Sequence, residues 1–452
     1  GCDNKSQNEE REKMKKKMLF LMAAIALFVP SVMAAEAPTY DEENKALFAN
    51  GTPVTVEART DGVAGALVKW NGGEKLLPAD NSVFGGSHDS AAKIDSTSVT
   101  VNGGTLHNVF GGGLHKSYVG TAVVTINGGK FTGKVHGGGA SSYSGSTCHQ
   151  PWYEGNKEKA TTVVDEAIVT INGGTLTDVF GGGEGISYTK KATLIVNKSF
   201  TGNIAYATAG GSNGYADEAY VELYGGNVKV LQAVNKGFIN NSDMLVDGAN
   251  VENAYVSSEG ANQKLGVTES ASLTIKSGKV KNVAPGQSGN PGEKATTISS
   301  LLYKEGTVEN MSNDFDGDMV SEAVILTFNA NGETETVAVP KGGSFTADEV
   351  TELTSELENA LVGSGYKFVG FFKDDKFTTA FDLTKPMNED TTVFMKLEEV
   401  KNNTEVKNND GKKAEDNPKT SDINLALILG MIALGGAGAF VSYKKKNSKA
   451  NN

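Results

Sequence analysis

A motif repeated at intervals of about 25 residues constrains the fold more than any other feature of this 452-residue chain. Its clearest copies read Val-Thr-Val/Ile-Asn-Gly-Gly. The motif asparagines follow one another at this constant interval, apart from one insertion in the middle of the series: Asn102, Asn127, Asn172 and Asn197. A unit of this length cannot bury its own apolar side, so successive copies are expected to stack on one another.

Each copy carries apolar residues three and one positions before the motif asparagine, which is the period of a β-strand. Nine copies follow this rule, with the pairs Val68/Trp70, Val99/Val101, Val124/Ile126, Val169/Ile171, Leu194/Val196, Val221/Leu223, Met244/Val246, Leu273/Ile275 and Leu301/Tyr303. We therefore expect a mainly β chain with a parallel β-helix over 67–318. Parallel crossovers are right-handed in about 98% of cases, which predicts a right-handed helix. A β-propeller or a row of small sandwiches is the alternative, but propeller blades of about 40–50 residues exceed this period.

The glycine-rich motifs are expected to form the corners of the β-helix. Glycine accounts for 55 residues, and it accepts the positive φ that tight corners need. Asparagine tolerates the left-handed conformation, and stacked asparagines can form a side-chain ladder. The predicted corner residues are Asn102, Gly103, Asn127, Gly128, Asn172, Gly173 and Asn197. An open solenoid needs capped ends, so 36–66 is expected to be a cap region with a short helix over 39–50.

The pattern of residues in the N-terminal segment predicts that the protein is exported. Residues 14–35 combine three lysines, an apolar stretch over 19–29 and a small-residue cleavage site, as a secretory signal does. A membrane anchor is the alternative, but the apolar stretch is short for a span. The segment 1–13, which precedes Met14, is interpreted as an over-extended start, because a secretory signal normally begins a chain.

The C-terminal part carries a short motif, an apolar run and a basic tail, in that order. The motif is Asn417, Pro418, Lys419, Thr420 and Ser421. The run over 423–443 can span a bilayer as a transmembrane helix, and the tail over 444–452 holds its lysines in the cytoplasm. This order resembles the sorting signal of Gram-positive cell-wall-anchored proteins, whose usual motif is Leu-Pro-x-Thr-Gly. The asparagine and serine at the ends of 417–421 are closer to the Asn-Pro-x-Thr variants. The resemblance implies attack by a sortase at Thr420 and transfer to peptidoglycan; without cleavage the segment is a single-pass membrane anchor.

Residues 319–398 have a different sequence pattern from the repeat and lack its Asn-Gly-Gly motif. They contain two strand patterns, a capping box from Thr346 to Glu349 and a helical apolar face. Four segments resemble the internalin-type B repeat, also called the Listeria–Bacteroides repeat: 326–329, 365–372, 377–382 and 389–396. The resemblance implies a small β-grasp-like module for extracellular interaction or spacing. Residues 399–416 are polar and are expected to form a stalk.

The sequence gives little indication of a catalytic site or a metal-binding site. β-Helix enzymes need paired carboxylates at one face, but the acidic residues do not recur in register: Asp165, Glu166, Asp178, Glu184, Asp217, Glu218 and Glu222. A cross-coil pair of His107 with His136 is a conceivable zinc or copper site, but no pair of histidines has metal-ligand spacing on a regular element. We expect no catalytic residue, no metal and no cofactor.

The insertion over 141–159 is the best local lead for binding. It carries Tyr143, Trp152 and Tyr153 in a Ser/Gly-rich loop, and aromatic residues on a loop suit contact with a glycan or protein. An ordinary excursion whose tryptophan packs back on the solenoid is the alternative. The net charge of -12 argues against a nucleic-acid partner.

Together these features predict a secreted surface protein of a Gram-positive bacterium. It would be anchored to the cell wall, or to the plasma membrane by its C-terminal helix. The function expected is a non-enzymatic adhesin or interaction protein, with sortase, peptidoglycan and a host glycan or matrix protein as partners. A polysaccharide-degrading enzyme and a passive stalk are the alternatives.

Overall fold

The computed structural model describes residues 36–141, 160–235, 237–258, 266–286 and 299–400. The chain divides into two compact units, with the boundary between Val320 and Ser321. Both units are built mainly of β-strands.

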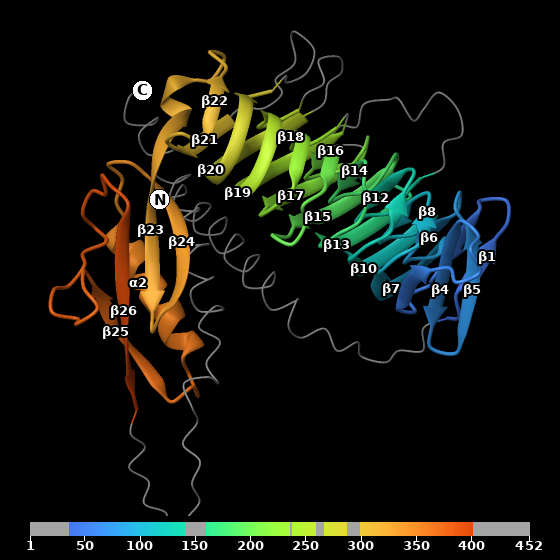
Figure 1. Ribbon diagram of the computed structural model, residues 1–452, viewed down its shortest axis with the longest axis horizontal. Coiled ribbons are helices and arrows are strands. Elements are labelled where there is room, and N and C mark those ends of the chain that lie inside the picture. The colour runs from blue at the N-terminus through green and yellow to red at the C-terminus, as the bar shows by residue number, and fades with distance from the viewer. Residues whose placement is uncertain (1–35, 142–159, 236, 259–265, 287–298, 401–452) are drawn as a thin grey trace, which may run out of the picture. The chain divides into compact units, whose positions relative to one another are not determined.

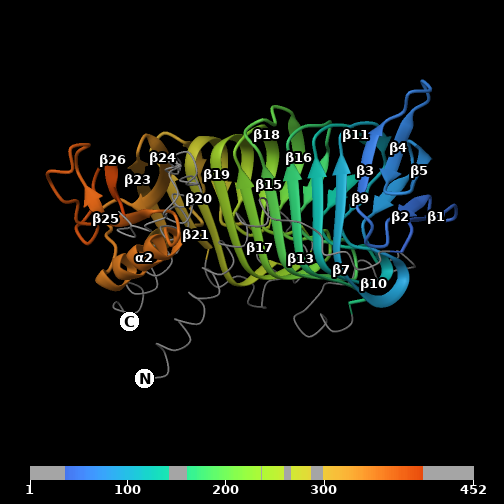
Figure 2. The same cartoon turned by 90° about the horizontal axis from the view of Figure 1, so that it is seen from below.

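The first unit is a parallel β-solenoid, as the repeat predicts (Figure 1). In its first ladder, each strand pairs in parallel with the strand one coil later. The strands are β3 (Val54–Ala58), β7 (His88–Val101), β10 (Leu114–Ile126), β13 (Thr162–Ile171), β15 (Ser187–Val196), β17 (Tyr215–Leu223), β19 (Phe238–Tyr255), β20 (Gly266–Ala284) and β21 (Ser299–Lys304). Figure 2 shows several of these strands side by side in chain order.

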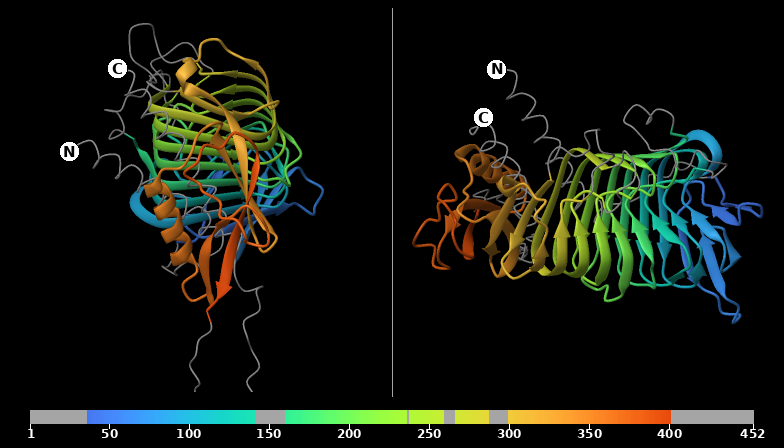
Figure 3. Two further views of the ribbon diagram at one scale, coloured as in Figure 1. Left: turned by 90° about the vertical axis from the view of Figure 1, so that its left-hand side faces the viewer. Right: turned by 90° about the horizontal axis from the view of Figure 1, so that it is seen from above.

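A second parallel ladder runs along another side of the same coils, as the right-hand panel of Figure 3 also shows. Its strands are β2 (Ala46–Phe48), β6 (Ser82–Phe84), β9 (Val109–Phe110), β12 (Lys134–His136), β14 (Asp178–Phe180), β16 (Asn203–Thr208), β18 (Asn227–Gln232) and β22 (Val308–Met311). The long strands β19 and β20 bend and take part in both ladders. A short pair, β8 (Thr105–Leu106) and β11 (Lys130–Phe131), forms a further side, and a 3-10 turn, η3 (Gly317–Met319), lies at the end of the unit.

The apolar pairs predicted from the repeat form the main core of the solenoid. Val99, Val124 and Val169 lie directly in register in successive coils and are fully buried. The other predicted pairs fall into the same ladder, with one exception. Each coil therefore closes a core that it could not close alone.

The exception is Val68/Trp70, which the sequence analysis wrongly assigned to the first coil. These residues lie in β4 (Gly65–Trp70), which pairs antiparallel with β3 and with β5 (Gly73–Pro78). The first coil instead begins within the expected cap region, where Val54 and Val56 pair in parallel with Val99 and Val101. The error has a simple cause: an antiparallel hairpin shows the same alternation of apolar residues as a coil strand.

The helix expected over 39–50 is also wrong. The segment forms β1 (Thr39–Asp41) and β2, which pair antiparallel with each other. All three residues of β2 are buried, and β2 also pairs in parallel with β6 in the second ladder. This pairing with the next coil overrides the local helical pattern.

The corner asparagines form the expected side-chain ladder. The Asn127 amide donates to the Asn102 Oδ1 at 2.8 Å, and the Asn172 amide donates to the Asn127 Oδ1 at 2.8 Å. Asn197 extends the ladder to Asn172. In the motifs that begin at Asn102, Asn127 and Asn172, the positive φ falls on the second glycine, as at Gly129 with φ of 91°, rather than on the asparagine.

The second unit is a small mixed sheet with one helix. β23 (Val320–Ala330) pairs antiparallel with β24 (Glu333–Pro340) and parallel with β26 (Thr391–Glu399), which pairs antiparallel with β25 (Tyr366–Phe372). The helix α2 (Ala347–Ala360) connects β24 to β25 and buries Leu353 and Leu357. The predicted capping box is present: the Glu349 backbone N–H donates to the Thr346 hydroxyl at 3.2 Å, and the Thr346 N–H donates to the Glu349 carboxylate at 2.6 Å.

Candidate functional site

A row of left-handed residues lies where β7 and β10 begin. His88 and Leu114 are partners in the parallel ladder, so Asp89 and His115 occupy neighbouring positions in successive coils. Asp89 has φ of 53° and His115 has φ of 63°, and Gly185 takes φ of 66° at the same row farther along. Glycine occupies this corner position in one coil, whereas two other coils, adjacent to each other, have an aspartate and a histidine at the same position. Their side chains are brought together by the spacing of about 4.8 Å between strands.

His88 is held in one orientation by two neighbours. Its ring stacks on Phe48, with ring centroids 5.0 Å apart, and its Nδ1 lies 3.4 Å from the Asp41 Oδ2. Asn44 donates to both Asp41 oxygens, from its backbone N–H at 3.0 Å and its side-chain amide at 3.1 Å. Those hydrogen bonds, with a smaller contribution from the His88 charge, lower the pKa of Asp41. Asp41 is therefore a fixed carboxylate behind the His88 ring.

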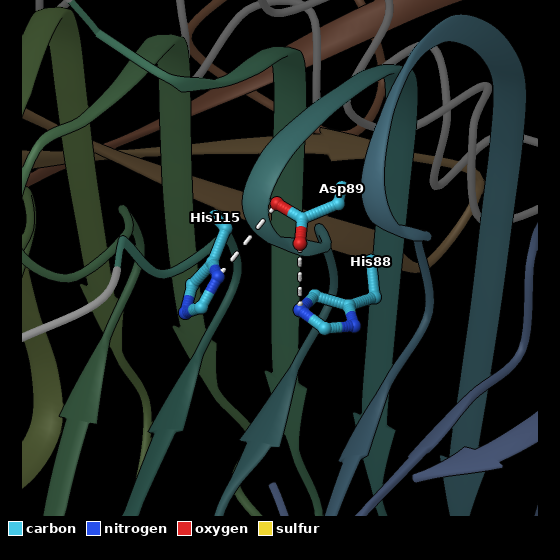
Figure 4. Close-up of side chains that lie close together, drawn as sticks. All are labelled: His88, Asp89 and His115. Atoms are coloured by element: carbon cyan, nitrogen blue, oxygen red, sulfur yellow. Dashed lines mark ion pairs between the residues drawn. The ribbon is translucent and has the colours of Figure 1, made fainter.

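The Asp89 carboxylate lies between the two imidazoles, as Figure 4 shows. Its Oδ2 is 3.2 Å from the His88 Nε2, and its Oδ1 is 3.7 Å from the His115 Nδ1. The two rings are 5.0 Å apart at 69°, and one ligand atom from each of the three residues lies within 4.8 Å of the others. The side chains keep 24%, 62% and 31% exposure for His88, Asp89 and His115, so the cluster is open to solvent.

This cluster was not predicted from the sequence, where the histidine pair considered was His107 with His136. The structure places His136 in register with Phe110 and Phe180, not with His107. His136 is fully buried between those two rings, whereas His107 is near Thr132, with 3.0 Å between its Nδ1 and the threonine hydroxyl. A signal was available in the sequence: His88-Asp89 and Leu114-His115 both follow the second-ladder segments by a fixed interval.

Tyrosines and aspartates line the outer side of the first ladder. The Tyr118 hydroxyl donates to the Asp165 Oδ2 at 3.0 Å, and the Tyr188 hydroxyl donates to the Asp217 Oδ2. These four half-buried residues form what we call the tyrosine–aspartate strip. Tyr188 also packs against Tyr215, with centroids 5.2 Å apart. The rings and carboxylates are thus held in place by bonds between adjacent coils.

Two lysines beside the strip form ion pairs with Asp165. The Lys93 and Lys190 amines lie 3.1 Å and 2.5 Å from its carboxylate oxygens, and each lysine side chain keeps 46% exposure. The Lys93 amine also lies 4.8 Å from the centre of the Tyr118 ring. Burial by itself raises the pKa of Asp165, but hydrogen bonds from Lys190, Lys93 and Tyr118 outweigh it and lower the pKa. This carboxylate is therefore held in its charged form.

Other acidic residues weighed for catalysis have partners of their own. Glu166 pairs with Lys191 at 2.7 Å, and Glu184 pairs with Lys134 at 2.7 Å. Glu222 accepts a hydrogen bond from the neighbouring Tyr224, and Glu218 accepts one from Tyr220. Asp178 stands apart from these pairs, and burial raises its pKa.

Several predicted site residues lie outside the described residues. These are the loop residues Tyr143, Trp152 and Tyr153, the signal segment over 14–35, the motif over 417–421 and the run over 423–443. The described chain ends at Ser141 and resumes at Ala160, which packs against the cluster that contains Tyr188 and Tyr215. The loop's C-terminal attachment is thus beside the tyrosine–aspartate strip.

Comparison with protein-family models, curated proteins and solved structures found no match to this chain. Within the described ranges, none of the helices combines the length and the apolar character required to cross a membrane.

Proposed function

We propose that this chain is an exported surface protein of a Gram-positive bacterium that binds its partners without catalysis. The support for export is the pattern over 14–35, and the support for anchoring is the motif over 417–421 with the apolar run and basic tail behind it. A right-handed parallel β-helix then forms the exposed body. A rigid body of this kind suits a protein that must present a fixed surface away from the cell.

The second unit would be a B-repeat-like module between this body and a polar stalk. Support comes from its strand order, in which the first and last strands are parallel neighbours and a helix crosses between the two hairpin pairs. That order agrees with a β-grasp-like module. The 344–364 segment, longer than in the usual repeat, contains α2.

The observation that carries the binding proposal is the tyrosine–aspartate strip. Half-buried aromatic rings offer flat apolar surface, and the neighbouring carboxylates and amines can bond hydroxyl groups of a sugar or polar groups of a protein. The bonds between coils order the side chains beforehand, which reduces the entropy lost on binding. A host glycan is the partner class that this combination fits best, and the loop with Tyr143, Trp152 and Tyr153 would add aromatic contacts.

The binding proposal is tested with the full chain on glycan arrays and immobilised matrix proteins. We expect a glycan signal that falls at least tenfold in Tyr118→Ala and less in Tyr118→Phe, which keeps the ring. Tyr206→Ala is the matched control, because Tyr206 is a half-buried tyrosine in β16, on another side of the coils. Equal binding by all three variants would contradict a role for the strip. Release of reducing ends would show a polysaccharide-degrading enzyme, and no binding at all would favour a passive stalk.

The anchoring proposal has its own test in a Gram-positive host. Mass spectrometry of the wall fraction should find a peptide that ends at Thr420 and is joined to peptidoglycan. The Thr420→Ala variant should lose this product. Recovery of both proteins intact in the membrane fraction would contradict sorting and favour a single-pass anchor.

A further inference from the structure

We propose that His88, Asp89 and His115 bind one Zn²⁺ ion between two adjacent coils of the solenoid. This site goes beyond the proposed binding function and does not depend on it. It also departs from the expectation of no metal, because the sequence does not show which residues of successive coils lie together.

The donor set is suited to zinc. Two imidazole nitrogens and one carboxylate oxygen are ligands that Zn²⁺ takes at about 2.0–2.2 Å, which places the ligand atoms of a tetrahedral site about 3.4 Å apart. The two distances from Asp89 oxygens to imidazole nitrogens, 3.2 Å and 3.7 Å, are already near that value. The separation between the two imidazole nitrogens is at most 4.8 Å, so the His115 ring needs a movement of up to about 1.4 Å.

Asp41 acts behind His88 as an outer carboxylate. Metal-binding histidines commonly donate their second ring N–H to such a group, which fixes the ring and leaves the other nitrogen free to bind. The His88 Nδ1 faces Asp41 at 3.4 Å, so its Nε2 is the nitrogen presented to Asp89. That Nε2 is buried and has no hydrogen-bond partner among the described residues, despite lying 3.2 Å from the Asp89 oxygen. A metal ion would satisfy its lone pair.

The backbone at this corner favours the same interpretation. Left-handed φ values are unfavourable for most L-residues because the Cβ crowds the following carbonyl oxygen, and glycine avoids this contact. Gly185 holds the corner in a later coil, whereas Asp89 and His115 hold it here. Aspartate and histidine tolerate the conformation better than most residues, so their side chains can be displayed at little extra cost. Non-glycine residues in this conformation occur often at binding sites, so their presence in two adjacent coils supports a site here.

The open side of the cluster leaves room for a fourth ligand. Asp89 keeps 62% of its side-chain exposure, so water can complete the coordination. Because Asp89 belongs to β7 and His115 to β10, a bound ion would join two coils that are otherwise linked by the ladder. Such a link stabilises the folded state by mass action, more strongly as the free zinc concentration exceeds the dissociation constant.

The test is zinc titration of the metal-free full chain by calorimetry, with mild detergent to keep the predicted 423–443 segment soluble. We expect one strong site that is weakened at least tenfold in His115→Ala and in Asp89→Asn. Asp41→Asn should weaken it about tenfold by removing the outer carboxylate. His107→Ala is the matched control, an exposed histidine outside the cluster, and should bind zinc as the unaltered chain does.

A second measurement separates this site from the thiols of Cys2 and Cys148 and from unfolding of a variant. Co²⁺ bound by the unaltered chain should show visible bands without the near-ultraviolet charge-transfer band of a thiolate ligand. Circular dichroism should give the same β signal for all variants. The proposal is overturned if no strong site is found, if His115→Ala binds zinc unchanged, or if Co²⁺ shows the thiolate band.

Discussion

Replacing His136 by phenylalanine should make the solenoid more resistant to acid. His136 stacks between Phe110 and Phe180, with ring centroids 4.8 Å and 4.5 Å away and planes within 6° of parallel. Its Nδ1 lies 3.2 Å from the Gly182 carbonyl oxygen, and its Nε2 has no hydrogen-bond partner among the described residues. The position is therefore built for an aromatic ring rather than for a charge.

The magnitude follows from the protonation of the buried ring. Burial lowers the pKa of His136 from 6.5 to about 4. Below pH 6.5 the unfolded chain binds a proton at His136, whereas the folded chain binds it only near pH 4. The free energy of unfolding is therefore highest above pH 6.5 and decreases as the pH falls from 6.5 to 4. The loss amounts to about 2.5 kcal/mol by pH 4.5 and about 3 kcal/mol in all. A phenylalanine has no such proton and removes this loss.

The assay is the free energy of opening of the 130–140 amides, measured by native-state hydrogen exchange of the full chain from pH 7.5 to 4.5. A local probe is needed because solenoids open piecewise. Relative to the unaltered chain, His136→Phe should gain about 2.5 kcal/mol across this range. Phe180→Leu is the control for packing and should lower stability by a similar amount at every pH. Parallel pH profiles for the unaltered chain and His136→Phe would refute the reasoning.

Three further changes test the corners and the second unit. Gly137→Ala should lower the free energy of unfolding by more than about 2 kcal/mol, measured by heat or urea, because its new Cβ would lie 2.3 Å from the Gly181 carbonyl oxygen. The control is Gly317→Ala, whose Cβ would have no atom within 4 Å and should leave the stability nearly unchanged. Asn127→Ala removes two ladder hydrogen bonds and should cost about 1–2 kcal/mol by the same measurement, and no change would show that solvent replaces them. Thr346→Ala should destabilise the second unit by about 1 kcal/mol, read from helical circular dichroism on heating; an unchanged midpoint would contradict the capping contribution.

Local patterns were sufficient for the coil architecture. The alternation at positions such as Val99 and Val101 predicts a strand with one buried face. Its recurrence at intervals of about 25 residues is what predicts a parallel partner one coil away. The capping box at Thr346 follows from contacts within a single turn of helix. Features of this kind are decided by neighbours in the sequence or by the repeat itself.

Where the sequence analysis went wrong, the missing information was the partner strand. Val68 and Trp70 alternate like a coil pair but belong to an antiparallel hairpin, and the segment over 39–50 becomes strands because β6 pairs with it. Alternation states that a strand has a buried face; it does not state which strand lies beside it.

The amino-acid sequence by itself determined that this chain repeats, that its coils are strands and that glycine and asparagine occupy the corners. Only the tertiary structure decided that Asp89 lies against His115, that Asp41 lies behind His88, and that His136 rather than His107 belongs to the aromatic stack. The physical reason is register. A shift of one residue between coils turns a side chain from one face to the other, so contacts across coils depend on the whole fold.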